Sequence, residues 1–248
     1  MPDPKLRDKR ILVTGGSRGL GRAFCVAFAE NGARVAFTHT RADDDAQATI
    51  EATRTAGSEA VAFRTSVLDI PATTAMVKDL EDRWGGIDIL VNNAGVTQNL
   101  PLALMEESDW DLVMDVNVKG TFLTSRAVLR GMIRRKGGVI LNIGSLAGAR
   151  MIEAPVHYCA SKSALIGLTE ALAKEVARYQ IRVNCLAPGL LEDGLGRNLP
   201  DYRLADYLKH CSLHRVGTFA EVAEFAAFLV SDGNSYMSGE TIVMDGGV

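Results

Sequence analysis

Alternation between two kinds of segment is the feature that most constrains the fold of this 248-residue chain. Short runs of β-branched and aliphatic residues are typical of buried strands, and the longer amphipathic runs between them follow the helical period. The strand-like runs are residues 10–14, 34–38, 60–65, 88–91, 139–143, 182–186 and 241–244. The helix-like runs are residues 19–31, 42–56, 71–84, 107–135, 156–179, 197–210 and 219–231. Such alternation predicts an α/β fold, a doubly wound parallel sheet of about seven strands with helices on both faces, in which ligands bind beyond the carboxyl ends of the strands.

Composition limits the classes of function. No Pro/Ser-rich linker or low-complexity segment divides residues 1–248, so we expect a single domain. The net charge of -3 gives no sign of nucleic-acid binding, and no apolar run approaches the ~18 residues that span a membrane. The charged segment 1–10 does not resemble a signal peptide, and the four scattered cysteines suit a reducing compartment. We expect a cytoplasmic protein without a membrane or nucleic-acid partner.

A glycine-rich turn follows the first predicted strand and opens the first predicted helix. It reads Thr14-Gly15-Gly16-Ser17-Arg18-Gly19-Leu20-Gly21. Glycines allow a tight turn and a close backbone approach, and the start of a helix offers free amides to a pyrophosphate. The turn could also be only a tight connection, because a glycine-rich sequence alone is weak evidence. Its strand–turn–helix context favours a Rossmann-like dinucleotide site with contacts from Gly15, Ser17, Arg18, Gly19, Leu20 and Gly21.

A second small-residue motif, Asn92-Asn93-Ala94-Gly95, comes directly after the fourth predicted strand. Small residues at the carboxyl end of a strand let a cofactor lie against the backbone, and asparagine side chains can tie neighbouring strands together. The alternative is an ordinary Asn/Gly turn. We expect cofactor contacts from Asn93, Ala94 and Gly95.

Tyr158 and Lys162 are four residues apart near the start of a predicted helix, so they share one helix face. Acid–base work by a phenol near neutrality needs its pKa lowered by roughly 3 units, about 4 kcal/mol. A lysine charge about 5 Å away supplies roughly 3 kcal/mol at an effective dielectric of about 20. Ser145 follows the fifth predicted strand and is placed to donate a hydrogen bond to a carbonyl. Taken alone, the pattern also fits a buried tyrosine, a solvated lysine and a loop serine.

Together these motifs resemble the short-chain dehydrogenase/reductase family over essentially the whole chain. The shared positions, in the family's order and spacing, are the glycine-rich turn, residues 92–95, Asn117, Ser145, Tyr158, Lys162, Pro188 and Gly189. The resemblance implies a catalytic set of Asn117, Ser145, Tyr158 and Lys162. Tyr158 would pass a proton to the carbonyl oxygen, Ser145 would hold that oxygen, and Lys162 would lower the tyrosine pKa and bind the nicotinamide ribose. Asn117 would hold a helix kink and a water in the proton relay.

Within this family, residues 92–122 and the final segment 238–247 resemble 3-oxoacyl-[acyl-carrier-protein] reductases. That implies reduction of a 3-oxoacyl thioester to the 3-hydroxyacyl thioester, with NADPH as the electron donor. One alternative is the same chemistry on another ketone or secondary alcohol, such as a polyketide, a steroid or a small ketone. A different class of function is a non-catalytic dinucleotide-binding protein. The sequence does not fix the acyl length, the pathway or the direction of the reaction.

The resemblance also implies cofactor contacts from Ser66, Val67, Pro188, Gly189 and Leu191, besides Tyr158 and Lys162. Two positions depart from the family pattern. Asp193 stands where many relatives carry a threonine that faces the cofactor, and a carboxylate there would repel a pyrophosphate. Ser66 and Val67 replace the aspartate that usually contacts the adenine.

NADPH is expected rather than NADH. NAD-binding relatives usually place an acidic residue roughly 20 positions beyond the glycine-rich turn to hold the ribose 2′-hydroxyl. Here that position is His39, followed by Thr40 and Arg41, and Arg18 projects from the turn itself. Two guanidinium groups and a hydroxyl suit a 2′-phosphate. The alternative is that both arginines are merely solvated.

The remaining predictions concern the surroundings of the site. Residues 190–215 are expected to form a substrate lid, with plain helical packing as the alternative. No metal site is expected from His210, Cys211 and His214, because they have no carboxylate partner or second cluster. His157 is interpreted as a helix-surface residue rather than a second acid, with a position lining the substrate entrance as the alternative.

A homotetramer is expected from the resemblance, with helices 107–135 and 156–179 pairing between subunits. Basic residues close these two helices, namely Arg130, Arg134, Arg135, Lys136, Lys174 and Arg178. If the helices of neighbouring subunits pack antiparallel, these groups could form a basic rim near the active-site mouth, suited to an acidic acyl carrier protein. Cations also favour helix C-termini for purely structural reasons.

Overall fold

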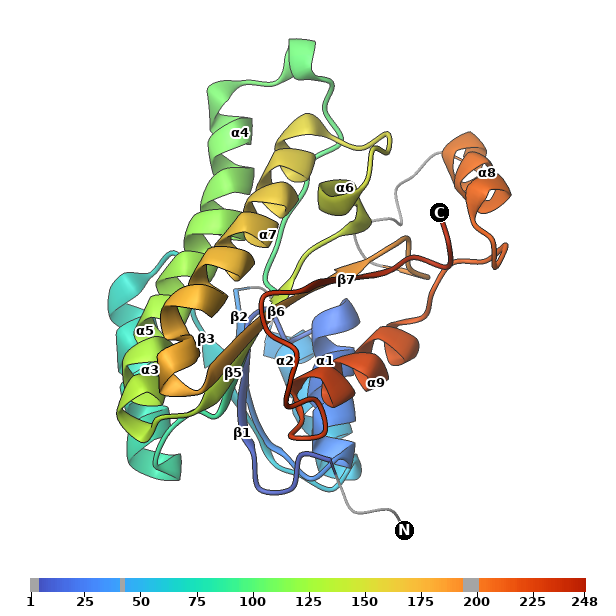
Figure 1. Ribbon diagram of the computed structural model, residues 1–248. Coiled ribbons are helices and arrows are strands. Elements are labelled where there is room, and N and C mark those ends of the chain that lie inside the picture. Colours follow the sequence, from blue (N-terminus) through green and yellow to red (C-terminus); the bar gives the residue numbers. More distant parts are fainter. Residues whose placement is uncertain (1–4, 41–42, 194–200) are drawn as a thin grey trace.

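A central parallel sheet organises the molecule (Figure 1). The computed structural model describes residues 5–40, 43–193 and 201–248. Within these residues seven strands form one sheet in the order β3-β2-β1-β4-β5-β6-β7. Their bounds are β1 Arg10–Val13, β2 Arg34–His39, β3 Ala60–Arg64, β4 Ile89–Asn92, β5 Gly138–Ile143, β6 Ile181–Pro188 and β7 Thr241–Met244. The predicted seven-stranded, doubly wound sheet is confirmed, and its strand order reverses between β1 and β4, where such sheets bind ligands.

Two layers of helices cover the sheet. One layer contains α1 Gly19–Glu30, α2 Asp43–Thr55 and α9 Phe219–Val230, and the other contains α3 Ile70–Trp84, α5 Gly120–Arg135 and α7 Val156–Val176. Successive side chains of a strand point to opposite faces. Ile11 of β1 therefore packs with Phe24 and Phe28 of α1, while Leu12 packs with Leu80 of α3 and its neighbours. This explains why the inner strands are apolar on both faces.

The helix predicted at 107–135 is interrupted. It divides into α4 Glu107–Met114, a π-helical turn at Asp115–Lys119, and α5. The Asn117 side chain pairs with the backbone of Val96, and a Cβ atom built on Gly120 would lie 2.4 Å from Val67, so the turn is drawn toward the loops after β3 and β4. The sequence predicted a kink at Asn117 but placed one continuous helix there.

Several boundaries differ from prediction. Two short helices, Leu102–Leu104 and α6 Leu146–Ala149, were not predicted, because one turn is too short to show a helical period. The helix expected to reach residue 179 ends in a 3₁₀ turn at Ala177–Tyr179. α8 spans Asp201–His210, and the earlier part of the helix predicted from residue 197 lies outside the described residues.

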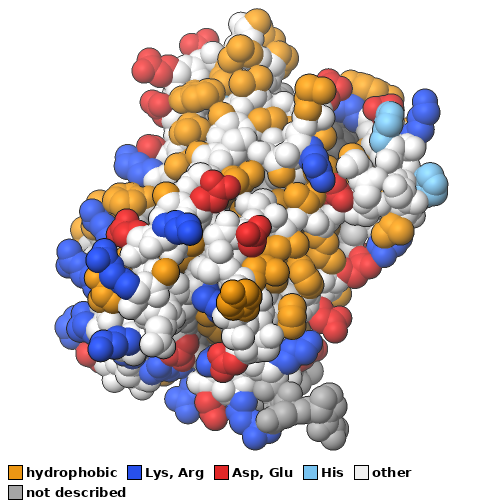
Figure 2. All heavy atoms as spheres, in the orientation of Figure 1, with side chains coloured by type: hydrophobic (Ala, Val, Ile, Leu, Met, Phe, Trp, Pro, Cys, Tyr) orange, Lys and Arg blue, Asp and Glu red, His pale blue; other side chains and the backbone are white. Residues whose placement is uncertain are grey.

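Charge is unevenly distributed over the exposed helices (Figure 2). Acidic side chains gather over α4, and basic side chains gather over the far end of α5. The acidic residues in and beside α4 are Glu106, Glu107, Asp109, Asp111 and Asp115, and the basic residues of α5 and its end are Arg126, Arg130, Arg134, Arg135 and Lys136. In the part of the chain described here, no helix is both long and apolar enough to cross a bilayer.

Within one chain, the fold does not bring the predicted basic rim to the active-site mouth. α5 ends just before β5 begins, so Arg134 and Lys136 lie at the amino edge of the sheet, and Lys174 lies about 24 Å along α7 from Tyr158. Arg135 turns inward and donates to the carbonyl of Ile87. Within one chain, these groups are therefore at the opposite edge from the predicted catalytic residues, and only a neighbouring subunit could bring them to the mouth.

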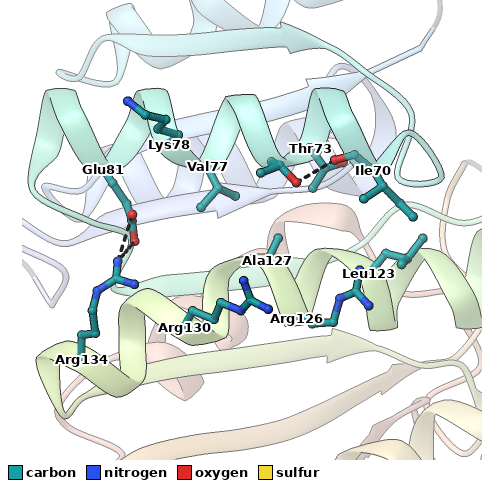
Figure 3. A pocket seen from close by; sticks show the side chains of 11 residues that line it. Ile70, Thr73, Val77, Lys78, Glu81, Leu123, Arg126, Ala127, Arg130 and Arg134 are labelled. Atoms are coloured by element: carbon teal, nitrogen blue, oxygen red, sulfur yellow. Dashed lines mark hydrogen bonds and ion pairs between the residues drawn. The ribbon is translucent and has the colours of Figure 1, made fainter.

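Arg130 and Arg134 face a groove between α3 and α5 (Figure 3). Arg134 pairs there with Glu81 at 2.9 Å, whereas Arg126 and Arg130 project over an apolar floor that includes Val77, Leu123 and Ala127.

Candidate active site

The glycine-rich turn after β1 is shaped so that side chains cannot enter it. Gly15 and Gly19 have φ of 67° and 52°, a region that favours glycine. A Cβ atom built on Gly21 would lie 2.1 Å from the carbonyl oxygen of Gly15, and one built on Gly16 would lie 2.4 Å from Phe37. The turn therefore leaves bare backbone at the start of α1. Within the described residues Arg18, the N-cap, makes no side-chain cap, so the first amides of α1 remain for a pyrophosphate.

The turn is locked to the end of β4 by Thr14 and Asn93. The Thr14 hydroxyl accepts hydrogen bonds from the backbone amides of Asn93 and Ala94, both at 3.0 Å. The Asn93 amide group donates back to the carbonyls of Thr14 at 3.0 Å and Gly15 at 3.1 Å. Asn92 donates to Asn142 of β5 at 2.9 Å. The expectation that these asparagines tie neighbouring strands together is confirmed, and the bare cradle fits a dinucleotide.

The residues predicted for the 2′-phosphate are only partly in place. Arg18 and Thr40 are exposed on the turn and at the end of β2. His39 is buried beside Phe37, so its ring lies inside rather than at the surface. Arg41 lies outside the described residues. The Ser17 side chain is buried as well, and its carbonyl accepts hydrogen bonds from the Arg22 side chain, which braces the turn.

Lys162 brings the predicted catalytic residues to one place. It is 4% exposed, its Nζ donates to the carbonyl of Ile143 at 2.7 Å, and it lies 5.7 Å from the centroid of the Tyr158 ring. A Cβ atom built on Gly95 would lie 3.6 Å from Lys162 Nζ and 3.3 Å from Asn117 Oδ1. The ends of β4 and β5, the π-turn and α7 therefore meet around Gly95.

Ser145 lies between the end of β5 and the start of α6. Its Oγ accepts the Ala147 amide at 3.1 Å as the N-cap of α6, and its hydroxyl is hydrogen-bonded with Tyr158. Burial raises the pKa of Tyr158 above its usual value of 10, although the bond to Ser145 opposes this rise. Burial also lowers the pKa of Lys162 to about 8. In the protein without cofactor, burial is the main cause acting on the pKa of Tyr158, so the lowering expected from Lys162 stays a prediction for the cofactor-bound protein.

Asn117 joins the π-turn to both neighbouring elements. Its Oδ1 accepts the Val96 amide at 2.8 Å, and its Nδ2 donates to the Val96 carbonyl at 3.0 Å and to Ser161 Oγ at 2.9 Å. Within the described structure its amide is occupied by protein partners. Sequence reasoning did not identify Ser161, although it lies between Tyr158 and Lys162.

The structure corrects the interpretation of His157. It was interpreted as a helix-surface residue, but its ring is fully buried. α4 packs against α7, and Asp109 of α4 lies near enough to His157 to act on its pKa. The helical pattern could not show this, because the burying element comes from another part of the chain.

The loop after β6 carries the last predicted cofactor contacts. The Gly189 amide donates to the carbonyl of Met244 at 2.9 Å, and the Leu190 amide donates to the Tyr207 hydroxyl at 3.0 Å. Tyr207 in turn donates to the carbonyl of Asp245 at 3.1 Å. Tyr207 of α8 thus fixes the Pro188–Gly189 corner to the C-terminal segment, a role the sequence reasoning missed.

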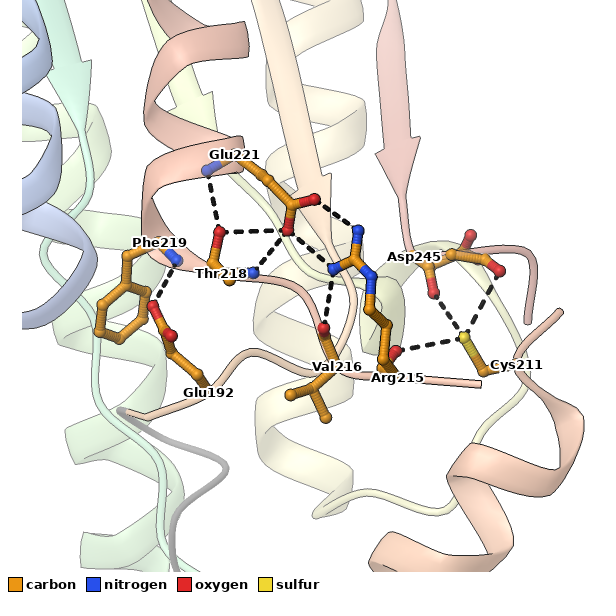
Figure 4. Close-up of polar contacts among 9 residues, drawn as sticks. Glu192, Cys211, Arg215, Val216, Thr218, Phe219, Glu221 and Asp245 are labelled. Atoms are coloured by element: carbon orange, nitrogen blue, oxygen red, sulfur yellow. Dashed lines mark hydrogen bonds and ion pairs between the residues drawn. The ribbon is translucent and has the colours of Figure 1, made fainter. Parts of the chain in front are cut away.

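Hydrogen bonds and an ion pair connect the two ends of the predicted lid segment to the start of α9 (Figure 4). Glu221 of α9 pairs with Arg215 and accepts the amide of Thr218 at 2.9 Å, while Glu192 accepts the amide of Phe219 at 2.9 Å. Leu191 pairs with Gly217 as an isolated bridge. The predicted lid segment 190–215 is therefore held at both ends.

The other predicted cofactor contacts, Ser66 and Val67, lie in the loop after β3 at the carboxyl edge of the sheet. Ser66 Oγ accepts the Leu68 amide at 3.2 Å, and Val67 is packed against Gly120 at the π-turn. Asp193 is the last described residue before the undescribed segment 194–200. Among the described residues, no three His, Cys, Asp or Glu side chains lie close enough together to hold a metal ion.

Comparison with known proteins agrees with this geometry. A family model described as Enoyl-(Acyl carrier protein) reductase matches residues 15–248. The 3-oxoacyl-[acyl-carrier-protein] reductase FabG of Staphylococcus epidermidis is 36% identical over 241 residues, which cover 97% of this chain and 99% of that protein. The protein of the same name from Chlamydia pneumoniae is 39% identical over 246 residues, 99% of each chain.

Solved structures are similar over the same length. A short-chain type dehydrogenase/reductase from Mycobacterium marinum has a TM-score of 0.93 at 36% identity, covering 98% of this chain and 97% of that one. A gluconate 5-dehydrogenase from Burkholderia cenocepacia, solved in complex with NADP and tartrate, has a TM-score of 0.92 at 34% identity, covering 98% and 96%.

Proposed function

The chain belongs to the short-chain dehydrogenase/reductase family, as an oxidoreductase of ketone or secondary alcohol groups, and from this premise we propose that it reduces 3-oxoacyl thioesters with NADPH. One observation carries the proposal: Ser145, Tyr158 and Lys162 meet beside the bare glycine cradle, at the carboxyl edge of the sheet. A protein that only bound a dinucleotide would have no use for a phenol joined to a serine hydroxyl at this place.

The side chains divide the chemistry between them. When bound in the cradle, the reduced nicotinamide cofactor supplies a hydride. Tyr158, whose pKa is raised by burial, keeps its proton at neutral pH and donates it to the carbonyl oxygen of the substrate. Ser145 donates a hydrogen bond to the same oxygen and orients it. Lys162, with a pKa of about 8, remains charged at neutral pH, stabilises the phenolate left by proton transfer and holds the ribose.

NADPH is proposed because the end of β2 carries no carboxylate among its described residues. Thr38, His39 and Thr40 stand there, and the exposed Arg18 projects from the turn. A similar solved structure, the gluconate 5-dehydrogenase, was obtained in complex with NADP. A guanidinium beside a hydroxyl suits a 2′-phosphate.

A thioester substrate is proposed because the curated relatives are named for 3-oxoacyl groups on an acyl carrier protein. Exposed apolar side chains beside the site, Met151 in the loop before α7 and Tyr202 on α8, suit an acyl chain. Arg203 of α8 pairs with Glu153 of the same loop at 2.6 Å. This contact supports a lid that lies over the substrate entrance.

A second candidate is a dehydrogenase or reductase of a non-thioester substrate. The similarity to a solved gluconate 5-dehydrogenase favours it, because that protein's name assigns it a polar substrate. Steady-state rates of acetoacetyl thioester reduction, compared with rates on gluconate-like and simple ketones, test the choice. A catalytic efficiency at least as high on a non-thioester ketone would overturn the thioester proposal.

A homotetramer is also proposed. The acidic α4 and basic α5 would complement each other if two chains packed with these helices antiparallel. Trp110 and Leu112 of α4 and Phe122 of α5 are exposed apolar side chains that such an interface would cover. Light scattering of the purified protein at micromolar concentration tests this assembly, and a monomeric mass would reject it.

A further inference from the structure

The backbone amide of Tyr158 has an unusual partner. It lies in the first turn of α7, where amides have no carbonyl of their own helix to bind. The N-cap is Pro155, which makes no side-chain cap within the described structure. The Tyr158 amide donates instead to Nδ1 of the preceding residue, His157, at 3.0 Å.

This bond defines the state of the His157 ring. Nδ1 accepts, so it carries no proton, and the ring is the neutral tautomer with its proton on Nε2. Full burial favours the neutral form and lowers the pKa of His157, with Asp109 acting in the opposite direction. Nε2 is buried without a hydrogen-bond partner among the described residues. A buried Nε2–H group without a partner costs stability, and an apolar side chain of similar volume would avoid that cost. The feature that the imidazole offers in return is the hydrogen-bond acceptor at Nδ1.

The carbonyl of Tyr158 is held as well. Ser161 Oγ donates to the Tyr158 carbonyl at 2.8 Å. The Ser161 hydroxyl oxygen also accepts a hydrogen bond from Asn117 Nδ2 at 2.9 Å. Ser161 is fully buried, like His157. A serine that bonds the carbonyl three residues earlier is common in helices, but here the serine also connects Tyr158 to the π-turn, and Asn117 is fixed there by Val96.

We propose that His157 and Ser161 are positioning residues that clamp the backbone of Tyr158 at its amide and its carbonyl, and so aim its hydroxyl at the reacting carbonyl. The proposal rests on the proposed function, in which Tyr158 is the proton donor. A tilt of about 10° at the Cα atom moves a hydroxyl as distant as that of tyrosine by about 1 Å, and a displacement of this size can cost ~100-fold in rate.

The alternative is that His157 is an ordinary core residue and Ser161 an ordinary helix serine. Either role would affect stability, but only the clamp acts selectively on the chemical step. Two substitutions of His157 separate them. Asparagine places Oδ1 where Nδ1 stands and keeps the acceptor, whereas glutamine places a polar group near Nε2 and loses the acceptor.

The experiment compares His157→Asn, His157→Gln, His157→Leu and Ser161→Ala, measuring kcat, KM and the Kd for NADPH with acetoacetyl thioester as the probe. Ser163→Ala is the matched control, because Ser163 is on the same helix but is exposed and bonds Gly148 instead. We expect kcat to fall about 10- to 100-fold in the glutamine, leucine and alanine variants, with NADPH binding unchanged. His157→Asn should stay within about threefold of the wild type, and the control should be unaffected.

Equal losses in His157→Asn and His157→Gln, in proportion to their loss of thermal stability, would overturn the clamp. Full kcat in His157→Gln and Ser161→Ala would overturn it too, even if His157→Leu failed to fold. Tyr158→Phe separates this failure from failure of the proposed function. If that variant is inactive while the clamp variants are fully active, only the clamp is wrong. If it keeps more than a tenth of the wild-type rate, the proposed function and the clamp both fall.

Discussion

At the amino edge of the sheet the half-buried Arg10 has the carboxylate of Asp88 as its counter-ion, whereas at the carboxyl edge the described residues give the buried Lys162 only a backbone carbonyl. Arg10 holds Asp88 through its backbone amide and two guanidinium nitrogens. Burial raises the pKa of Asp88, but these hydrogen bonds outweigh it and the pKa is lowered overall. Lys162, by contrast, has no carboxylate within ion-pair distance among the described residues, and burial lowers its pKa to about 8.

Under the proposed function, this difference separates an edge that serves stability from an edge that serves chemistry. A paired charge is stabilising and inert, because each group favours the charged form of the other. An unpaired, buried lysine beside a phenol costs stability but leaves both groups ready to respond to a ligand or a proton. Substitutions at both edges of the sheet test this contrast.

Replacing Tyr158 should break the chemistry and nothing else. We expect Tyr158→Phe to lower kcat about 100- to 10,000-fold, because the variant keeps the ring but loses the proton donor. NADPH affinity should stay nearly intact, whereas Lys162→Ala should damage both turnover and cofactor affinity. Steady-state kinetics and cofactor titration measure the two effects. A variant with normal kcat, or one that loses cofactor binding, would contradict the role given to Tyr158.

Lys162 should make the protein without cofactor more stable as pH rises. Its folded pKa of about 8 lies below the ordinary 10.5, so the unfolded chain binds more protons between these values. The free energy of unfolding should therefore increase by up to about 3 kcal/mol across this window, relative to a Lys162→Met variant. The raised pKa of Tyr158 acts in the opposite direction only above about pH 10. Urea unfolding of both proteins at pH 7.5 and 9.5 measures the effect, and parallel pH curves would disprove it.

Asp88→Asn should affect stability but not turnover. The substitution removes the carboxylate from a half-buried arginine at the edge remote from Tyr158, which we expect to cost about 2 kcal/mol. The folded pKa of Asp88 is lowered, so its contribution is present above about pH 4 and is lost as pH falls through the lower folded value. Unfolding curves at pH 7 and pH 3 should show the difference shrinking. A substantial fall in kcat at pH 7 would show that the two edges are coupled.

Arg18→Ala should sharpen the distinction between cofactors. If Arg18 contacts the 2′-phosphate, the variant should lose about tenfold in catalytic efficiency with NADPH and little with NADH. Steady-state kinetics with NADPH and with NADH measure the effect. The neighbouring Arg22 does not serve as a control position, because its side chain donates to the carbonyl of Ser17 and so supports the turn itself. Equal or better efficiency of the wild type with NADH would reject the cofactor preference altogether.

The smallest effect concerns the basic residues at the amino edge. Reversing Arg130 and Lys174 to glutamate should raise KM for a carrier-bound substrate several-fold, with strong salt dependence in the wild type. KM for a small free thioester should hardly change. Because these residues lie far from Tyr158 within one chain, the effect requires a neighbouring subunit. Identical behaviour of both substrates would mean that these cations only cap their helices.

The order of strands and helices, and the identity of the groups at the carboxyl edge, could be predicted from the sequence alone. Thr14 ends the first predicted strand, and Asn93 and Ser145 come shortly after the fourth and fifth. The carboxyl ends of parallel strands meet at one edge of the sheet, so the proximity of these residues follows from chain order alone. Tyr158 and Lys162 share a helix face for an equally local reason.

How those groups are held and charged depends on tertiary contacts that the sequence does not reveal. His157 is buried by α4, Arg135 turns inward to Ile87, and Asn117 bends its helix toward Val96. Each depends on a contact between segments far apart in the chain, which no helical or strand period records. The pKa of Lys162 has the same origin, because desolvation depends on every element that excludes water from the side chain, while the sequence shows only the charge four residues from a tyrosine.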